Sequence, residues 1–85
     1  MTPYAVSWLP NAEDPLAEIW LRSANRTAVT AAQSRIDAEL AHNPGSKGAE
    51  LAEGLRRLIV HPLKAFFEIH DAERKVEITA VDEVP

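Results

Sequence analysis

Five basic side chains lie close together between residues 56 and 70: Arg56, Arg57, His61, Lys64 and His70. In an extended chain, side chains an even number of residues apart point to the same side. We therefore expect Arg57 and His61 on one side of a strand, and Lys64 and His70 on one side of the next. Imidazoles transfer protons and cations stabilise a phosphorane, which is the chemistry that RNA cleavage by 2′-hydroxyl attack requires. Arg57, His61 and Lys64 are the catalytic candidates, although the alternation itself favours a merely solvated strand face.

Other site chemistries have weaker support in the sequence. His42, His61 and His70 do not show metal-ligand spacing, and a chain without cysteine has no thiolate ligands. Glu68 and Asp71 beside His70 could act as carboxylates that orient a base, but a strand end of mixed charge explains them equally well. We expect no metal and no small-molecule cofactor.

Three aromatic residues are candidates for contact with another protein. Phe66 shares its parity with Lys64 and Glu68, so its ring is expected on the polar side of a strand. An apolar ring there suits a partner protein or the edge of the helices. Trp8 and Trp20 are expected in the core or at the edge of a partner groove.

Three consecutive antiparallel strands are expected to position these side chains. The first contains the apolar run 58–60, the second covers residues 63–70 and the third covers residues 76–80. The charged residues 71–74 are expected to form the hairpin loop between the last two. The residues expected on the buried side are Leu63, Ala65, Phe67, Ile69, Val76, Ile78 and Ala80.

A further strand and two helices are expected before them. Residues 4–9 predict a strand that Pro10 ends, with Tyr4, Val6 and Trp8 on one side. The first helix is expected to have Pro15 in its first turn and Asn11 or Asp14 as its cap. Its shared face is expected to comprise Leu16, Ile19, Trp20 and Ser23.

The second helix is expected over residues 28–41, with Asn25 or Thr27 as its cap. Residues 46–54 are polar and glycine-bounded, and we expect a loop there. The apolar stripe of this helix is expected to comprise Val29, Ala32, Ile36 and Leu40.

The expected architecture is therefore α+β, of order β-α-α-β-β-β, with a helical hairpin packed on a mainly antiparallel four-stranded sheet. The 85 residues suit one domain over 1–85. A net charge of −4 argues against a generally basic, nucleic-acid-binding surface. The sequence has no apolar segment long enough to span a membrane or direct secretion, so we expect a cytoplasmic protein without a membrane partner.

Several short segments in one order and spacing carry a likeness to a known family. They are YAVSW at 4–8, LAEIW at 16–20, RTAVTAA at 26–32, NP at 43–44, RRL at 56–58, FEI at 67–69 and VEI at 76–78. Over residues 4–81 the chain resembles the RelE/ParE family of bacterial toxins from type II toxin–antitoxin modules, and most of all its short plasmid-stabilisation-protein subfamily.

The resemblance implies a toxin-like protein that a cognate antitoxin binds and neutralises. A disordered antitoxin tail would become ordered along the helices and the sheet. Trp20, Phe66 and Arg56 are the residues then expected to contact it. Some family members cut messenger RNA on the ribosome, and others act on DNA gyrase.

Three functions follow from the resemblance. Active nucleases of the family tend to place Arg, His or Tyr near the end of the last strand, where this sequence has Asp82 and Glu83. Acids there repel a phosphate backbone at short range. We therefore rank an antitoxin-binding module first, a degenerate non-catalytic member that sequesters antitoxin second, and a ribosome-dependent mRNA endoribonuclease third.

Overall fold

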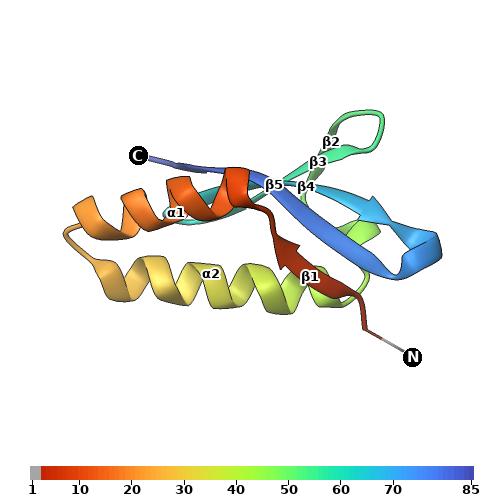
Figure 1. Cartoon of the computed structure of the whole chain (residues 1–85), viewed down its shortest axis with the longest axis horizontal. Coiled ribbons are helices and arrows are strands. Elements are labelled where there is room, and N and C mark those ends of the chain that lie inside the picture. Colours follow the sequence, from red (N-terminus) through yellow and green to blue (C-terminus); the bar gives the residue numbers. More distant parts are fainter. Residues whose placement is uncertain (1–2) are drawn as a thin grey trace.

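The computed structural model describes residues 3–85, which form two helices and one five-stranded sheet (Figure 1). The strand order is β1-β5-β4-β3-β2, with β1 parallel to β5 and the other neighbours antiparallel. The elements are β1 (Ala5–Trp8), α1 (Pro10–Arg22), α2 (Arg26–Ala41), β2 (Ala49–Ala52), β3 (Leu55–Val60), β4 (Leu63–His70) and β5 (Lys75–Glu83). Short 3-10 turns lie at Pro44–Ser46 and Asp71–Glu73.

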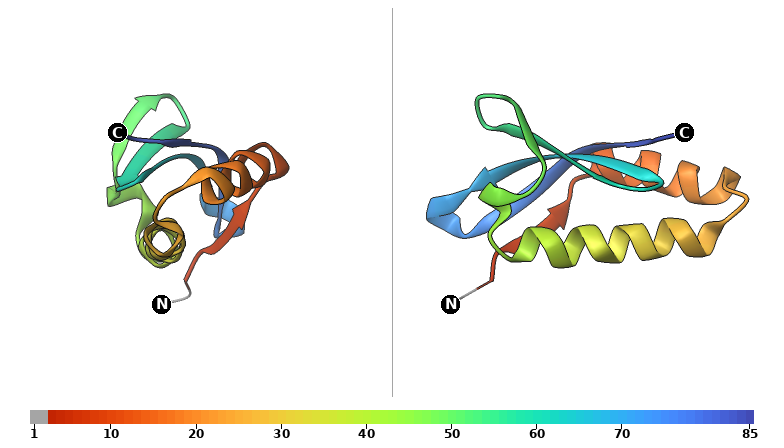
Figure 2. Two further views of the ribbon diagram at one scale, coloured as in Figure 1. Left: turned by 90° about the vertical axis from the view of Figure 1, so that its left-hand side faces the viewer. Right: turned by 180° about the vertical axis from the view of Figure 1, so that it is seen from behind.

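The helical hairpin covers one side of the sheet, as expected, and the views in Figure 2 agree on this placement. Leu63, Ala65 and Phe67 of β4 are fully buried, while the residues between them are half-buried. The stripe expected on α2 is also buried. None of the helices within residues 3–85 is long and apolar enough to cross a membrane.

The sheet has five strands and not the expected four, because residues 49–52 pair with β3 instead of forming a loop. Ala49 lies opposite Arg57, and Glu50 lies opposite Arg56. All four residues of β2 are exposed, so burial imposes no alternation that the sequence could display. Gly48 allows the chain before β2 to approach the backbone of β3 closely. Its φ is +63°, and a Cβ there would lie 1.9 Å from the backbone oxygen of Arg57.

A β-bulge corrects the expected face of Ala80. Phe67 pairs with Ile78, but Phe66 pairs with Ala80, so β5 has one extra residue at Thr79. An extra residue reverses the parity of the strand beyond it. Val76, Ile78 and Val81 are therefore the buried residues of β5, and Ala80 lies on the same face as Phe66.

The N-terminal cap of α1 differs from the expectation, whereas the N-terminal cap of α2 agrees with it. α1 begins at Pro10 with Leu9 as its N-cap, so neither Asn11 nor Asp14 caps it, and Pro15 lies inside the helix. A proline at the first position already supplies the favoured φ and lacks only an N–H that would have no partner. Asn25 caps α2 as expected: its side-chain oxygen accepts a hydrogen bond from the Ala28 N–H at 3.1 Å.

Candidate functional site

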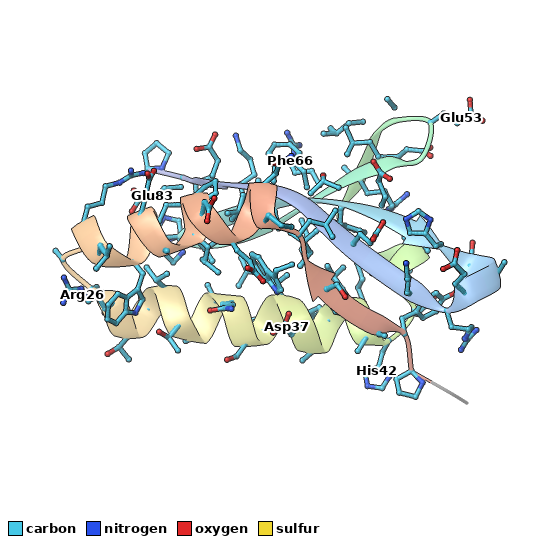
Figure 3. All side chains as sticks on the ribbon, viewed as in Figure 1. Arg26, Asp37, His42, Glu53, Phe66 and Glu83 are labelled. Atoms are coloured by element: carbon cyan, nitrogen blue, oxygen red, sulfur yellow. The ribbon has the colours of Figure 1, made fainter. Side chains whose placement is uncertain are left out.

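The face of the sheet that the helices leave uncovered brings together part of the expected basic cluster. We call the outward residues Arg57, Ile59, Lys64 and Phe66 the open-face patch. Arg57 pairs with Phe66 and Ile59 pairs with Lys64, so all four lie on one face. Phe66 projects from the side of the sheet away from α2 (Figure 3), and the Lys64 Nζ lies 5.8 Å from the centre of its ring. Ile59 is 52% exposed.

His61 is separate from this patch. It was expected on a strand with Arg57, but β3 ends at Val60 and His61 begins the turn to β4. Its position is about 13 Å along the chain from Arg57, at about 3.3 Å per residue. The His61 Nε2 lies 3.1 Å from the backbone oxygen of Pro85. The open face therefore holds Arg57 and Lys64 near one another, whereas His61 lies beyond the end of the strand.

One of the two acids at the end of β5 lies beside a cation of the open face, and the other pairs with a helix. Asp82 of β5 lies directly opposite Lys64 in the register. Glu83 forms an ion pair with Arg22 of α1, with 3.4 Å between Nη2 and Oε1. A carboxylate adjacent to Lys64 reduces the attraction of this region for a phosphate.

Arg56 has a structural contact within the chain. It pairs with Phe67, so it starts on the side of the sheet that faces the helices. Its Nε and Nη2 donate to the backbone oxygen of Lys47 at 3.2 and 3.1 Å. These bonds fasten the segment that leads into β2, next to the close approach at Gly48.

A shallow groove of about 570 Å³ lies between the two helices. It is lined by Trp8, Glu13, Leu16, Ala17, Trp20, Leu21, Val29, Thr30 and Gln33. Trp20 was expected in the core or at the edge of a partner groove. It is 39% exposed and lines this groove, while its neighbour Ile19 is buried. The Trp20 Nε1 donates to the Thr30 Oγ1 at 3.2 Å, which joins the two helices across the groove.

Two further side chains, Arg26 and Trp8, form polar contacts beside this groove. The Arg26 guanidinium lies over the Trp20 ring at 4.6 Å and donates to the backbone oxygens of Trp20 and Leu21, at 3.0 and 2.8 Å. It thus satisfies carbonyls at the end of α1. The Trp8 Nε1 donates to the Asp37 Oδ1 at 2.6 Å. Nothing in the spacing of Trp8 and Asp37 along the chain signals this pair.

At the far end of the open face, the carboxylates around His70 are not the pair that the sequence predicted, Glu68 and Asp71. The carboxylates near the His70 Nε2 belong to Glu77, at 2.8 Å, and Glu68, at 4.0 Å. Asp71 instead accepts a hydrogen bond from the Tyr4 hydroxyl at 2.6 Å. That bond raises the pKa of Tyr4, and burial and the negative charge of Asp71 act in the same direction. Glu77 escaped the sequence analysis because only the β4–β5 register brings it to His70.

Similarity to solved structures covers almost the whole chain. A chain of the RelBE2 toxin–antitoxin complex from Mycobacterium tuberculosis superposes with a TM-score of 0.79 and 22% identity, over 98% of this chain and 93% of that one. A chain of the chromosomal ParDE system from P. aeruginosa gives 0.75 and 17% identity, over 96% and 97%. A chain of the archaeal RelE–RelB complex from Pyrococcus horikoshii gives 0.65 and 14% identity, over 98% and 96%.

The similarity to these three chains is one of structure, at 14% to 22% sequence identity. No protein-family model matches the chain, and no curated protein matches it. The shared features are two helices on one side of a mainly antiparallel sheet, over nearly the full length of each chain. The chain therefore shares the fold of these three chains.

Proposed function

We propose that this chain is the toxin-like component of a type II toxin–antitoxin module and binds a cognate antitoxin protein. One observation supports this most strongly: the chain superposes over 98% of its length on a chain from a toxin–antitoxin complex and covers 93% of that chain. The other two similar structures also come from complexes of such pairs. We propose residues 1–85 as a single toxin-like domain that acts in the cytoplasm, as expected from the sequence.

The open-face patch is the proposed anchor for the antitoxin. An apolar ring on an uncovered sheet face loses contact with water when a partner covers it, and aromatic side chains often dominate such contacts. Phe66 lies between Arg57, its cross-strand neighbour, and Lys64, on its own strand. A segment that combines an apolar side chain with acidic ones would match this arrangement.

Trp20 is a second proposed anchor, at the groove between the helices. Phe66 and Trp20 lie on different sides of the molecule, so one partner can reach both only by wrapping around it. A segment that is disordered when free and orders on binding can cover two such surfaces. Arg56 has the weakest case of the proposed contacts, because its guanidinium is bound to the backbone oxygen of Lys47.

We propose binding ahead of RNA cleavage. Catalytic groups must converge within hydrogen-bond reach of one reacting centre. Arg57 and Lys64 share a face, but His61 lies in the turn beyond β3. Asp82 also lies opposite Lys64. An endoribonuclease that uses Arg57, His61 and Lys64 is thus the third candidate, and a non-catalytic member that sequesters antitoxin is the second.

Co-expression with the product of the adjacent gene tests the proposal. We expect the two proteins to co-purify and to migrate as one complex in gel filtration. Phe66→Asp should weaken the complex at least about 10-fold, because it places a carboxylate where an apolar ring would be covered. Phe66→Tyr, which keeps the ring, is the matched control and should bind nearly as well. Failure of the wild-type chain to form any complex would overturn the proposal.

Expression of the chain alone separates the three candidate functions. A toxin should arrest bacterial growth, and co-expression of its partner should restore it. Messenger RNA ends mapped after induction report cleavage, and loss of that cleavage in Arg57→Ala or Lys64→Ala would move the endoribonuclease to first place. Normal growth together with tight antitoxin binding would favour the sequestering role.

A further inference from the structure

The far end of the open face carries three side chains that converge on one point. Glu68 and His70 are two residues apart on β4, and Glu77 of β5 lies directly opposite Glu68. Their donor atoms all lie within 4.8 Å of one another. We propose that Glu68, His70 and Glu77 form a binding site for a divalent first-row transition-metal ion, for which Zn²⁺ is the probe. This inference does not depend on the proposed function.

One donor atom of the group, the His70 Nε2, is not satisfied by its own contacts. The carboxylates of Glu68 and Glu77 lie directly opposite each other on one sheet face, where they repel, and a cation between them would offset this repulsion. The His70 Nε2 lies 2.8 Å from the Glu77 Oε1, yet within residues 3–85 it has no hydrogen-bond partner and no access to water. The two atoms are close without being aligned as donor and acceptor. Metal ligands have this relation, because their lone pairs point at a shared ion and not at each other.

The donor atoms, all within 4.8 Å of one another, must move to reach the separations of a metal site. Donors at about 2.0–2.1 Å from a tetrahedral ion lie about 3.3–3.4 Å apart. The His70–Glu77 separation of 2.8 Å would have to widen by about 0.5 Å, and the His70–Glu68 separation of 4.0 Å would have to shrink by a similar amount. The Glu68 side chain is 47% exposed and can make this adjustment by rotating. Three protein ligands leave the fourth position of the ion for water.

Lys75 is the nearest competing cation. Its Nζ lies 3.7 Å from the Glu77 Oε2 and 3.4 Å from the Glu73 Oε2. It approaches the oxygen of Glu77 that does not face His70, so an ion on Oε1 and the ammonium on Oε2 can coexist. In the competing arrangement, Lys75 balances the carboxylate of Glu77 and no metal binds. The experiment below distinguishes these two arrangements.

The donor set favours some ions over others. One imidazole and two carboxylates suit Zn²⁺ and its first-row neighbours. Mg²⁺ prefers six oxygen donors in octahedral geometry and keeps much of its water. We therefore expect Zn²⁺ to bind and Mg²⁺, at the same concentration, not to displace it.

Calorimetric titration of the full chain, freed of metal with a chelator, tests the site. Wild type should bind one Zn²⁺ per chain. His70→Asn and Glu77→Gln should each weaken binding at least about 10-fold, the lower end of what the loss of even an outer-shell partner costs a metal site. His42→Asn and Glu53→Gln make the same chemical changes at exposed positions, on α2's cap and in the β2–β3 turn (Figure 3), and should leave the affinity unchanged.

Two further measurements protect the conclusion against misfolded variants. Co²⁺ in place of Zn²⁺ should give the visible absorption of a tetrahedral site in wild type and lose it in His70→Asn. Lys75→Met should raise the Zn²⁺ affinity a few-fold, because it removes a competing positive charge and no ligand. The proposal is overturned if wild type binds no Zn²⁺, or if His42→Asn weakens binding as much as His70→Asn does. The first result would leave Lys75 as the cation that balances Glu77, and the second would place the bound Zn²⁺ outside Glu68, His70 and Glu77.

Discussion

The two faces of β4 show how one strand serves two purposes. Leu63, Ala65 and Phe67 point toward the helices and are fully buried. Lys64 and Phe66, between them, point to the uncovered side and stay half-buried. Each face carries a phenylalanine, Phe67 on one and Phe66 on the other, so the exposure of the ring depends on which face the helical hairpin covers. The covered face supplies most of the apolar burial that stabilises the fold, and the open face keeps an aromatic ring available for a partner.

The difference between the two faces is tested most directly by replacing Phe66 and Phe67, one at a time, with alanine. Phe67→Ala should lower the free energy of unfolding by about 3–5 kcal/mol, because it leaves a cavity under both helices. Phe66→Ala should cost about 1 kcal/mol or less, since a ring at a partly exposed site leaves no enclosed cavity. Urea unfolding followed by tryptophan fluorescence measures both. Equal losses would show that the open face is packed as tightly as the covered one.

The edge strand β2 belongs to neither face and depends on its glycine. Gly48→Ala should destabilise the chain by about 1–3 kcal/mol from the left-handed backbone alone, with an added cost from the clash with the Arg57 oxygen. Gly45→Ala is the matched control, since a Cβ there meets nothing within 4 Å. Amide hydrogen exchange should show the loss of protection confined first to β2 and β3. An equal loss of protection in the helices would show that the core depends on the pairing of β2 with β3.

Much of the fold was predictable because burial leaves a period in the sequence. β4 has one face under the helices, so its alternation is plain, and α2 shows its buried stripe at three- and four-residue steps. β2 has no buried residue and therefore no period. The bulge at Thr79 was also invisible, because it appears only when β5 is aligned with β4. Ala80 was consequently assigned to the wrong face.

The candidate surfaces were predictable only in part, for a related reason. Parity alone placed Phe66 and Lys64 on the polar side of β4, and the register then added Arg57 from β3. His61 could not be placed without the end of β3, and Glu77 could not be joined to His70 without the β4–β5 pairing. Spacing along one strand carries information about its faces, whereas contacts between strands depend on turns and bulges.

The cap on α2 tests how the covering hairpin is held in place. Asn25→Ala should reduce stability by about 1 kcal/mol, because it removes the acceptor for the Ala28 N–H. Asn11→Ala makes the same change at an exposed position within α1, where no cap is lost. Thermal unfolding by circular dichroism measures both. Equal effects would show that the loss lies in the asparagine side chain itself and not in the cap.

The smallest expected effect is the pH dependence of stability that comes from an ion pair between α2 and the segment before β2. The Lys47 Nζ lies 2.9 Å from the Glu39 Oε2, and this contact, followed by the charge of Lys47, holds the pKa of Glu39 below its ordinary value. A carboxylate with a lowered pKa in the folded state stabilises the fold above its unfolded pKa, and that contribution is lost as pH falls through the folded pKa. Wild type should therefore lose stability more steeply below about pH 4.5 than Glu39→Gln, which cannot titrate.

Two variants separate the ion pair from the carboxylate alone. Lys47→Met should flatten the pH profile nearly as much as Glu39→Gln, because it removes the cause of the pKa shift. Glu53→Gln, in the exposed β2–β3 turn, should leave the profile as in wild type. Urea midpoints measured from pH 3 to pH 7 give the comparison. A profile unchanged in Lys47→Met would mean that solvent screens the contact between Lys47 and Glu39.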